Sequence, residues 1–242
     1  GRVKMEIYAK GMGFEQLNEA VRRCKEQKIV IRGCGGQRFI ACAGTGRRID
    51  VYGVAGNGAG AYMESGVLNI FGNAQDALAD TMNGGEIYVF GRCGDAAGYA
   101  MRGGEVFVRG DAGYRVGVHM KEYGKHIPAL IVGGRAGCFL GEYLAGGIIA
   151  VLDLQNTGAP LGEEAARGMH GGRIYVRGEA GVPLPDCVTA READGEDMRL
   201  LLPYLEKFCA AFGGDAKKLA AEKFTLITPA PSNGVKRLYV SN

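Results

Sequence analysis

A segment of this sequence recurs with a fixed period of 19 residues, and this regularity limits the possible folds more than composition does. The stretches RRIDVYGVAGNGAGAYM, GVLNIFGNAQDALADTM, GEIYVFGRCGDAAGYAM and GEVFVRGDAGYRVGVHM align without a gap. With small changes in length, the register continues through PALIVGGRAGCFLGEYL, GGIIAVLDL and GGRIYVRGEAG, which gives about seven repeats between Arg47 and Gly181. A period near 20 residues is typical of proteins in which each repeat stacks on the next.

Each repeat contains a short strand with one apolar face. Alternation of apolar with polar or aromatic residues over a few positions indicates a strand that buries one side. The inward positions are Ile49 and Val51, Leu68 and Ile70, Ile87 and Val89, Val106 and Val108, Leu130 and Val132, Ile149 and Val151, and Ile174 and Val176. The corner residues that follow the strands are Gly53, Gly72, Gly91, Gly110, Gly134, Asp153 and Gly178. We expect these corners to need a positive φ, which glycine adopts at least cost and aspartate tolerates better than most residues.

Three further columns recur at fixed distances after the corner. One column is small (Ala55, Ala74, Cys93, Ala112, Ala136), one is apolar (Ala59, Leu78, Ala97, Val116, Leu140) and one is long and flexible (Met63, Met82, Met101, Met120, Leu144, Met169). In a stack of repeats, each column would form a ladder inside the core. Because so short a unit has no helical period, the sequence predicts an all-β solenoid: a single-stranded, right-handed parallel β-helix with about seven coils of 19 residues.

The two ends of the chain depart from the repeat. Four apolar residues share one face of the helix that FEQLNEAVRRCKEQ predicts, ahead of the strand KIVIRG: Phe14, Leu17, Val21 and Cys24. After Gly181, DGEDMRLLLPYLEKFCAAFGG indicates one or two helices that end at Gly213, and FTLITPAPSNGVKRLYVSN indicates an extended tail. We therefore expect an N-terminal helix and entry strand as a cap at 1–45, the repeats at 46–181, and a C-terminal helical extension with a tail at 182–242.

Composition argues against several classes of protein. The 242 residues include 42 glycines and 7 prolines without a Gly-X-Y period, so the glycine excess belongs neither to collagen nor to a disordered linker. A net charge of +3 argues little for nucleic acid, and no apolar run approaches the roughly 18 residues of a membrane span. Seven cysteines without a Cys-x-x-Cys pair favour reduced thiols in a cytoplasmic protein. Because the chain starts with Gly1 rather than Met, we expect a trimmed chain or a piece of a longer product.

The search for a reaction centre finds only weak candidates. GNGAGA, at 56–61, matches the dinucleotide-binding fingerprint with Ala in its last place, but the next strand follows it where a helix is needed. His119, His126 and Cys138 can be drawn as a metal site, although no established ligand spacing supports it. The acidic pair at 163–164 lies in an interrupted stretch that is typical of a solvated loop or short helix. We therefore assign no catalytic, cofactor-binding or metal-binding residue to this chain.

Several motifs together resemble one known family. They are the Gly-Gly-x-Ile/Val-x-Val repeats, RGCGGQRFIA, FGNAQDALADTMNGG, VGVHMKEYGK and, above all, FLGEYLAGGIIAVL. Over about residues 3–240, the chain resembles the C-terminal GXGXG β-helix domain of the glutamate synthase large subunit, in the free-standing form found where that enzyme's domains are separate chains. It resembles the C subunit of formylmethanofuran dehydrogenase more distantly.

The resemblance implies a structural subunit of an oxidoreductase that makes two glutamates from glutamine and 2-oxoglutarate. Such a subunit holds the glutaminase and synthase domains in position. FMN and iron–sulfur clusters are then expected on the partner chains and no cofactor on this one, and the partners are expected to be proteins, with neither nucleic acid nor a membrane involved. The family's glutaminase uses an N-terminal cysteine, whereas this chain opens Gly1-Arg2-Val3 and has its first cysteine at Cys24. No catalytic residue of the family can therefore be carried over.

Two other functions are left open. One is a non-catalytic scaffold in another amidotransferase or redox complex, such as formylmethanofuran dehydrogenase, which gene neighbours would distinguish from glutamate synthase. The other is an independent enzyme with a site that its residues do not reveal. The identity of the partner chains, the electron donor and the oligomeric state, a homo-oligomer included, are also left open.

Aromatic residues gather on the outward side of the predicted strands. The column beside the corner reads Tyr52, Phe71, Phe90 and Arg109, and the neighbouring column reads Asp50, Asn69, Tyr88 and Phe107, with Tyr175 in the last repeat. An exposed aromatic strip favours aggregation unless another part of the chain or a partner covers it. Two interpretations are left open: the terminal helices pack on this strip, or part of it is a docking face for a synthase or glutaminase chain.

Overall fold

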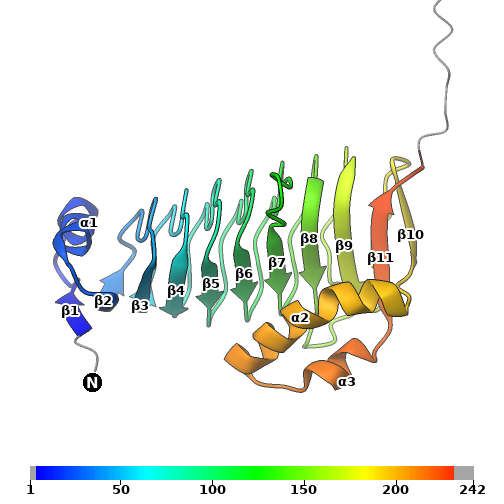
Figure 1. Ribbon diagram of the computed structural model, residues 1–242. Coiled ribbons are helices and arrows are strands. Elements are labelled where there is room, and N and C mark those ends of the chain that lie inside the picture. Colours follow the sequence, from blue (N-terminus) through cyan, green and yellow to red (C-terminus); the bar gives the residue numbers. More distant parts are fainter. Residues whose placement is uncertain (1–3, 232–242) are drawn as a thin grey trace, which may run out of the picture.

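The chain forms one large sheet with helices packed at its ends and on its outer face (Figure 1). The computed structural model describes residues 4–231. Their strands pair in the order β1-β2-β3-β4-β5-β6-β7-β8-β9-β11-β10. The elements are β1 (Lys4–Tyr8), α1 (Phe14–Arg23), β2 (Lys28–Gly35), β3 (Arg47–Val54), β4 (Gly66–Phe71), β5 (Glu86–Val89), β6 (Glu105–Val108), β7 (Ala129–Val132), β8 (Ala145–Val151), β9 (Gly171–Arg177), β10 (Val188–Glu192), α2 (Gly195–Phe212), α3 (Ala216–Ala220) and β11 (Phe224–Pro229).

Strands β1 to β9 run parallel, each beside the strand of the preceding repeat. In the middle of the sheet, Leu68 pairs with Ile87, and Ile87 pairs with Val106, in step with the sequence period. The inward residues of these strands are buried in one core, and the small, apolar and methionine columns are buried in the same core. The predicted interior rows are therefore confirmed.

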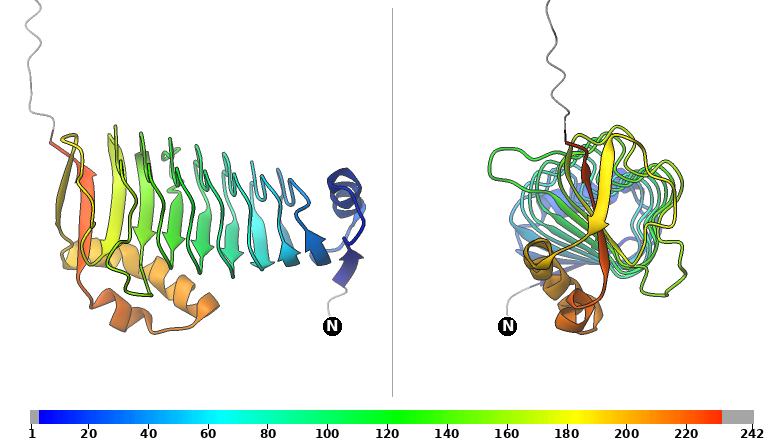
Figure 2. Two further views of the ribbon diagram at one scale, coloured as in Figure 1. Left: turned by 180° about the vertical axis from the view of Figure 1, so that it is seen from behind. Right: turned by 90° about the vertical axis from the view of Figure 1, so that its right-hand side faces the viewer.

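A layer of turns closes the other side of this core. In each repeat except the last, three alternate positions have left-handed backbone, for example Ala77, Ala79 and Thr81 with φ of 57°, 58° and 52°. The Ala77 N–H donates to the Asp95 carbonyl at 2.8 Å in the next repeat, and the Ala79 N–H donates to the Ala59 carbonyl at 2.9 Å in the preceding one. The turns therefore stack through backbone hydrogen bonds, and successive repeats overlie one another in the end-on view (Figure 2).

The expected fold class is wrong. In place of an all-β solenoid, a right-handed parallel β-helix of about seven coils, the described residues form one open, mixed sheet of 11 strands. β11 joins β9 in the antiparallel direction, and β10 joins β11 in the same way. Within residues 4–231 the named strands lie only in this sheet, because the rest of each repeat is held in left-handed turns that cannot continue a strand. An 18-residue helix, α2, also packs on the sheet.

Most of the corner positions need glycine for a different reason from the one predicted. Of the predicted corner glycines, only Gly53 and Gly178 have a positive φ, 123° and 79°. At Gly72 the requirement is space, because a Cβ there would overlap the carbonyl oxygen of Gly53 in the preceding repeat. Successive corners thus approach too closely for a side chain. Asp153 does have a positive φ, 39°, as predicted.

Helices lie at both ends of the array of repeats. α1 buries Leu17 and Val21 against the core, as its apolar face predicts, and α2 extends from the N-cap Asp194 to Gly213. Sequence patterns did not indicate β10, and the predicted extended tail contributes β11 to the sheet. The part of that tail beyond residue 231 lies outside the described residues. Nothing in the fold tests the division at 45/46 and 181/182, which stays a prediction.

Candidate interaction surface

A row of closely spaced aromatic rings lies on the outer face of the sheet, at the C-terminal ends of β3, β4 and β5. The ring centroids of Tyr52 and Phe71 are 4.7 Å apart, and those of Phe71 and Phe90 are 4.6 Å apart. The Arg32 guanidinium, from β2, lies 4.8 Å from the centroid of the Tyr52 ring. The parallel register produces this row, because equivalent positions of neighbouring strands pair directly, as Tyr52 does with Phe71.

Helix α2 covers the part of this face that belongs to β5–β9 and β11 (Figure 1). Near its start, the Tyr175 hydroxyl donates to the carbonyl oxygen of Asp197 at 3.0 Å. At its end, the Phe212 ring meets the Phe90 ring edge-on, with 4.9 Å between centroids. Its 18 residues span about 27 Å, roughly the width of five or six strands. A helix anchored at β9 therefore ends at β5 and does not cover β2–β4.

The two predicted aromatic columns consequently differ in what covers them. Tyr88, Phe107 and Tyr175 lie under α2, and the last two are fully buried there. Tyr52 is 39% exposed, and Phe71 is partly exposed. Packing by a terminal helix therefore accounts for Tyr88, Phe107 and Tyr175. Among the described residues, 4–231, no helix covers Tyr52 and Phe71.

Three charged side chains fix the C-terminal half of α2 to the sheet. Lys207 Nζ donates to Glu86 Oε1 at 2.9 Å and to Glu105 Oε2 at 2.6 Å. Burial acts to raise the pKa of Glu86, but hydrogen bonds from Tyr88 and Lys207 outweigh it and hold that pKa below its usual value. Burial acts to lower the pKa of Lys207, and the two carboxylates raise it above its usual value.

On the uncovered part of the face, Asp50 is buried among cations. Its carboxylate accepts hydrogen bonds from Asn69 Nδ2 at 2.7 Å and Arg48 Nε at 3.0 Å, and Lys28 Nζ lies 3.5 Å away. Burial acts to raise the pKa of Asp50, but the bonds from Asn69 and Arg48 hold it below its usual value. The side chains of Arg48 and Lys28 are 53% and 40% exposed. With two cations on one carboxylate, this cluster has an excess positive charge.

A second buried carboxylate fixes the start of α2. Asp197 Oδ2 lies 2.7 Å from Arg191 Nη1 of β10, and Asp197 Oδ1 accepts from Arg173 Nη1 of β9 at 3.1 Å. The Asp194 backbone N–H also donates to Asp197, at 3.0 Å. Burial acts to raise the pKa of Asp197, but the bonds from Arg191 and from the Asp194 backbone hold it below its usual value. The helix is thus tied to both strands at its first turn.

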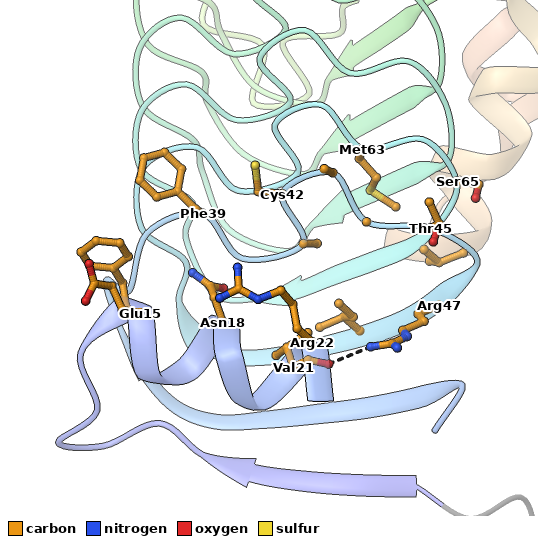
Figure 3. A pocket seen from close by; sticks show the side chains of 16 residues that line it. Glu15, Asn18, Val21, Arg22, Phe39, Cys42, Thr45, Arg47, Met63 and Ser65 are labelled. Carbon is orange, nitrogen blue, oxygen red and sulfur yellow. Dashed lines mark hydrogen bonds between the residues drawn. The ribbon is translucent and has the colours of Figure 1, made fainter. Parts of the chain in front are cut away.

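A cavity of about 590 Å³ separates α1 from the first turns (Figure 3). Apolar side chains from α1, the turn layer and β3 make up much of its wall. Two arginines line it, and both are engaged within the chain. Arg47 Nη1 donates to the Val21 carbonyl at 2.7 Å, and Arg22 Nη2 pairs with Glu19 Oε2 at 2.7 Å.

The dinucleotide-like segment 56–61 belongs to the turn layer. It forms turns and leads to β4, so no helix follows it. A Cβ at Gly56 would overlap the Gly36 carbonyl oxygen of the preceding repeat. The glycine at this position therefore serves close packing, as at Gly72.

The remaining weak candidates are not brought together into a site. The His119 ring stacks on the Tyr143 ring with 5.2 Å between centroids. Among residues 4–231, no group of three or more His, Cys, Asp or Glu side chains could hold a metal ion, so His119, His126 and Cys138 do not form one. The acidic pair at 163–164 is exposed in the turn layer.

All seven cysteines are free thiols in the structure. Cys34 and Cys93 are buried in the core among the small residues. Burial raises the pKa of the Cys93 thiol to about 12 and also raises that of Cys34. These two thiols therefore behave as small core side chains.

Sequence reasoning missed the charges that hold α2. Glu86 and Glu105 occupy equivalent positions of consecutive repeats and pair across β5 and β6. Two neighbouring carboxylates repel each other unless a cation lies near them. The aligned repeats therefore indicate that a cation binds at this position. They do not identify Lys207, which lies 121 residues from Glu86 along the chain.

Comparison with known proteins gives two findings. The family model described as GXGXG motif matches residues 43–229, which include all the repeats between Arg47 and Gly181 and the C-terminal helices. Uncharacterized protein MJ1350 of Methanocaldococcus jannaschii is 43% identical over 255 residues, covering 99% of this chain and 97% of that protein. Within residues 4–231, no helix combines the length and the apolar character that crossing a membrane requires.

Proposed function

The chain belongs to the GXGXG motif family, that of the glutamate synthase C-terminal domain, and from this premise we propose that it is a structural subunit of a cytoplasmic glutamate synthase. It holds a glutaminase chain and a synthase chain in position while they convert glutamine and 2-oxoglutarate into two glutamates. The observation that carries the proposal is the match of the family model to residues 43–229.

The fold supports a role in spacing other chains. Each repeat is bonded to its neighbours twice, through the sheet and through the turns, as at Ala77 and Ala79. Surfaces far apart on such a body keep a constant separation. Constant spacing suits an enzyme in which an intermediate passes between two centres, because small misplacements of reacting groups cost large factors in rate.

We assign the cofactors of the reaction to the partner chains. FMN and the iron–sulfur clusters belong to them in this proposal, and this chain contributes binding surface alone. The assignment rests on the family resemblance, in which the flavin barrel, the cluster cysteines and the N-terminal nucleophile lie outside this domain. The uncovered aromatic residues Tyr52 and Phe71 supply a surface of the kind that anchors partner chains.

Reconstitution from separately purified chains of one organism tests the proposal. We expect the synthase and glutaminase chains to form a stable complex only when this chain is added, as measured by size-exclusion chromatography with light scattering. Glutamine-dependent glutamate formation should rise when the complex forms. Glutamate formation from free ammonia by the synthase chain should change little, because that step needs no glutaminase.

Two results would contradict the proposal. One is an elution profile and a glutamine-dependent rate that do not change when this chain is omitted. The other is a flavin or iron–sulfur absorption band, or glutaminase activity, in the pure chain alone, which would show a site within it.

A further inference from the structure

Helix α2 shows how the outer face of the sheet binds a helix. Three of its apolar residues are buried against the sheet: Leu201, Leu205 and Phe208. Beside them, the Lys207 ammonium bonds to Glu86 and Glu105. The face therefore binds a helix through apolar contacts next to a cation that bonds to two carboxylates.

The row of sheet residues that binds Lys207 continues onto the uncovered strands, where its residues carry the opposite charge. In the sheet register, Glu105 pairs with Glu86, Glu86 with Val67, Val67 with Arg48, and Arg48 with Lys28. The row thus changes from two carboxylates on β5 and β6 to two cations on β2 and β3. Asp50 neutralises only one of these cations, so positive charge remains on this part of the face.

The apolar half of the contact is present on the uncovered strands as well. Tyr52 and Phe71 continue the aromatic row from Phe90, and both retain exposed surface. A helix on β2–β4 would meet these rings on one side and cations on the other. α2 is placed in the same way, with the Phe90 ring on one side and the Glu86 carboxylate on the other.

We propose that β2–β4 bind an amphipathic helix of a partner chain, which lies end to end with α2 and carries a carboxylate where α2 carries Lys207. Its apolar residues pack on Tyr52 and Phe71, and its carboxylate bonds to Arg48 and Lys28. Three strands are about 14 Å wide, which roughly nine or ten helical residues span. A contact of this size forms one part of a larger interface.

The identity of the partner as a glutamate synthase chain rests on the proposed function. The chemistry of the helix rests on the sheet face alone: exposed rings, an excess of positive charge, and continuity with a helix site that the chain already fills. Charge complementarity of this kind selects a partner more than it adds affinity. The two parts of the inference can therefore be tested separately.

Two ten-residue peptides from the C-terminal part of α2, residues 203–212, are the probes, because a helix of this length fits on three strands. One keeps Lys207 and the other carries Lys207→Glu, and both carry Cys209→Ser to prevent disulfide formation. We expect the full-length chain to bind the Glu peptide about fivefold more tightly or better, by fluorescence anisotropy at low ionic strength. Only that peptide has a carboxylate at position 207, where the proposed helix meets Arg48 and Lys28.

Variants of the chain provide matched controls. In Arg48→Glu the preference should invert, so that the Lys peptide binds about fivefold more tightly. Arg115→Glu, on the turn layer, should leave the preference unchanged; it is structurally tolerated because Glu164 holds the equivalent position of a later repeat with a similar φ. Tyr52→Ala should weaken both peptides without changing their order, because it removes apolar contact alone.

Equal binding of the two peptides, or no binding of the Glu peptide at about 1 mM, overturns the inference. The reconstitution with synthase and glutaminase chains separates it from the proposed function. If the peptides discriminate as expected and those chains do not bind, the proposed function fails and the helix belongs to another partner. If those chains bind and the peptides do not discriminate, the proposed function stands and the helix site is wrong.

Discussion

Phe90 and Phe212 meet edge-on where the covered and uncovered parts of the sheet face join. Their ring centroids are 4.9 Å apart and their planes are at 82°. Phe90 comes from the repeats and Phe212 from the last turn of α2, so the contact ties the C-terminal helix to the aromatic row. Edge-to-face pairs of this kind are favourable beyond the area that they bury.

The first prediction is that Phe90→Ala destabilises the chain more than Tyr52→Ala. Phe90→Ala removes contacts with two rings, Phe71 and Phe212. Tyr52 is 39% exposed, so its removal costs less buried contact. We expect losses of about 2–3 kcal/mol and about 1 kcal/mol in the free energy of unfolding, measured in urea by circular dichroism. Phe212→Ala should resemble Phe90→Ala, and the double variant should lose less than the sum. Equal losses at Tyr52 and Phe90 would contradict the division of the face.

The second prediction concerns acid. Asp50, Glu86 and Asp197 have folded-state pKa values below their usual ones. Such carboxyls stabilise the folded chain fully above their unfolded pKa of about 4, and this contribution is lost as the pH falls through the lower folded value. The melting temperature should therefore change little from neutral pH to about pH 5 and fall steeply below about pH 4.

Asp197→Asn is the control for this acid dependence. It should lower the melting temperature at neutral pH, because Arg173 and Arg191 lose their shared carboxylate. It should also show a smaller decrease in acid, since one of the linked groups no longer titrates. An identical pH profile in the two proteins would mean that Asp197 does not contribute as its contacts indicate.

The interior could be predicted from the sequence, and the fold class could not. A period of 19 residues places equivalent residues side by side, so the burial of Leu68 and Ile87 follows from alternation alone. The period does not say which part of a repeat is strand and which is turn. Ala77 and Ala79 are left-handed, although alanine prefers the right-handed helix, because hydrogen bonds from the neighbouring repeats impose that backbone.

The candidate surface was predictable in the same partial way. The aromatic columns are visible in the aligned repeats because parallel register turns sequence spacing into stacking, as between Tyr52 and Phe71. Coverage by α2 was not predictable. It depends on contacts such as Lys207 with Glu86, across 121 residues, and no local pattern sets the direction in which the helix crosses the sheet.

The third prediction concerns thiol reactivity. Cys93 is 5% exposed with a pKa raised to about 12, whereas Cys187 is exposed. Because alkylation requires an accessible thiolate, we expect iodoacetamide to label Cys187 rapidly in the native chain and Cys93 only after unfolding. Mass spectrometry of digested samples at increasing urea concentration measures both rates. Labelling of Cys93 at the rate of Cys187 without urea would contradict its place in the core.

The last prediction is that glycine stabilises turn positions that now hold alanine. Ala96 and Ala100 have φ of 58° and 51°, and Gly168 holds the position equivalent to Ala100 in the repeat that begins at Gly146. Left-handed backbone costs a residue with a Cβ about 1–2 kcal/mol, and relief of this strain exceeds the entropic cost of glycine, about 0.5–1 kcal/mol. We therefore expect Ala96→Gly and Ala100→Gly to raise the melting temperature slightly in scanning calorimetry. Ala210→Gly, at an exposed position of α2, should lower it, and a decrease of similar size in all three variants would show that the turns impose no strain.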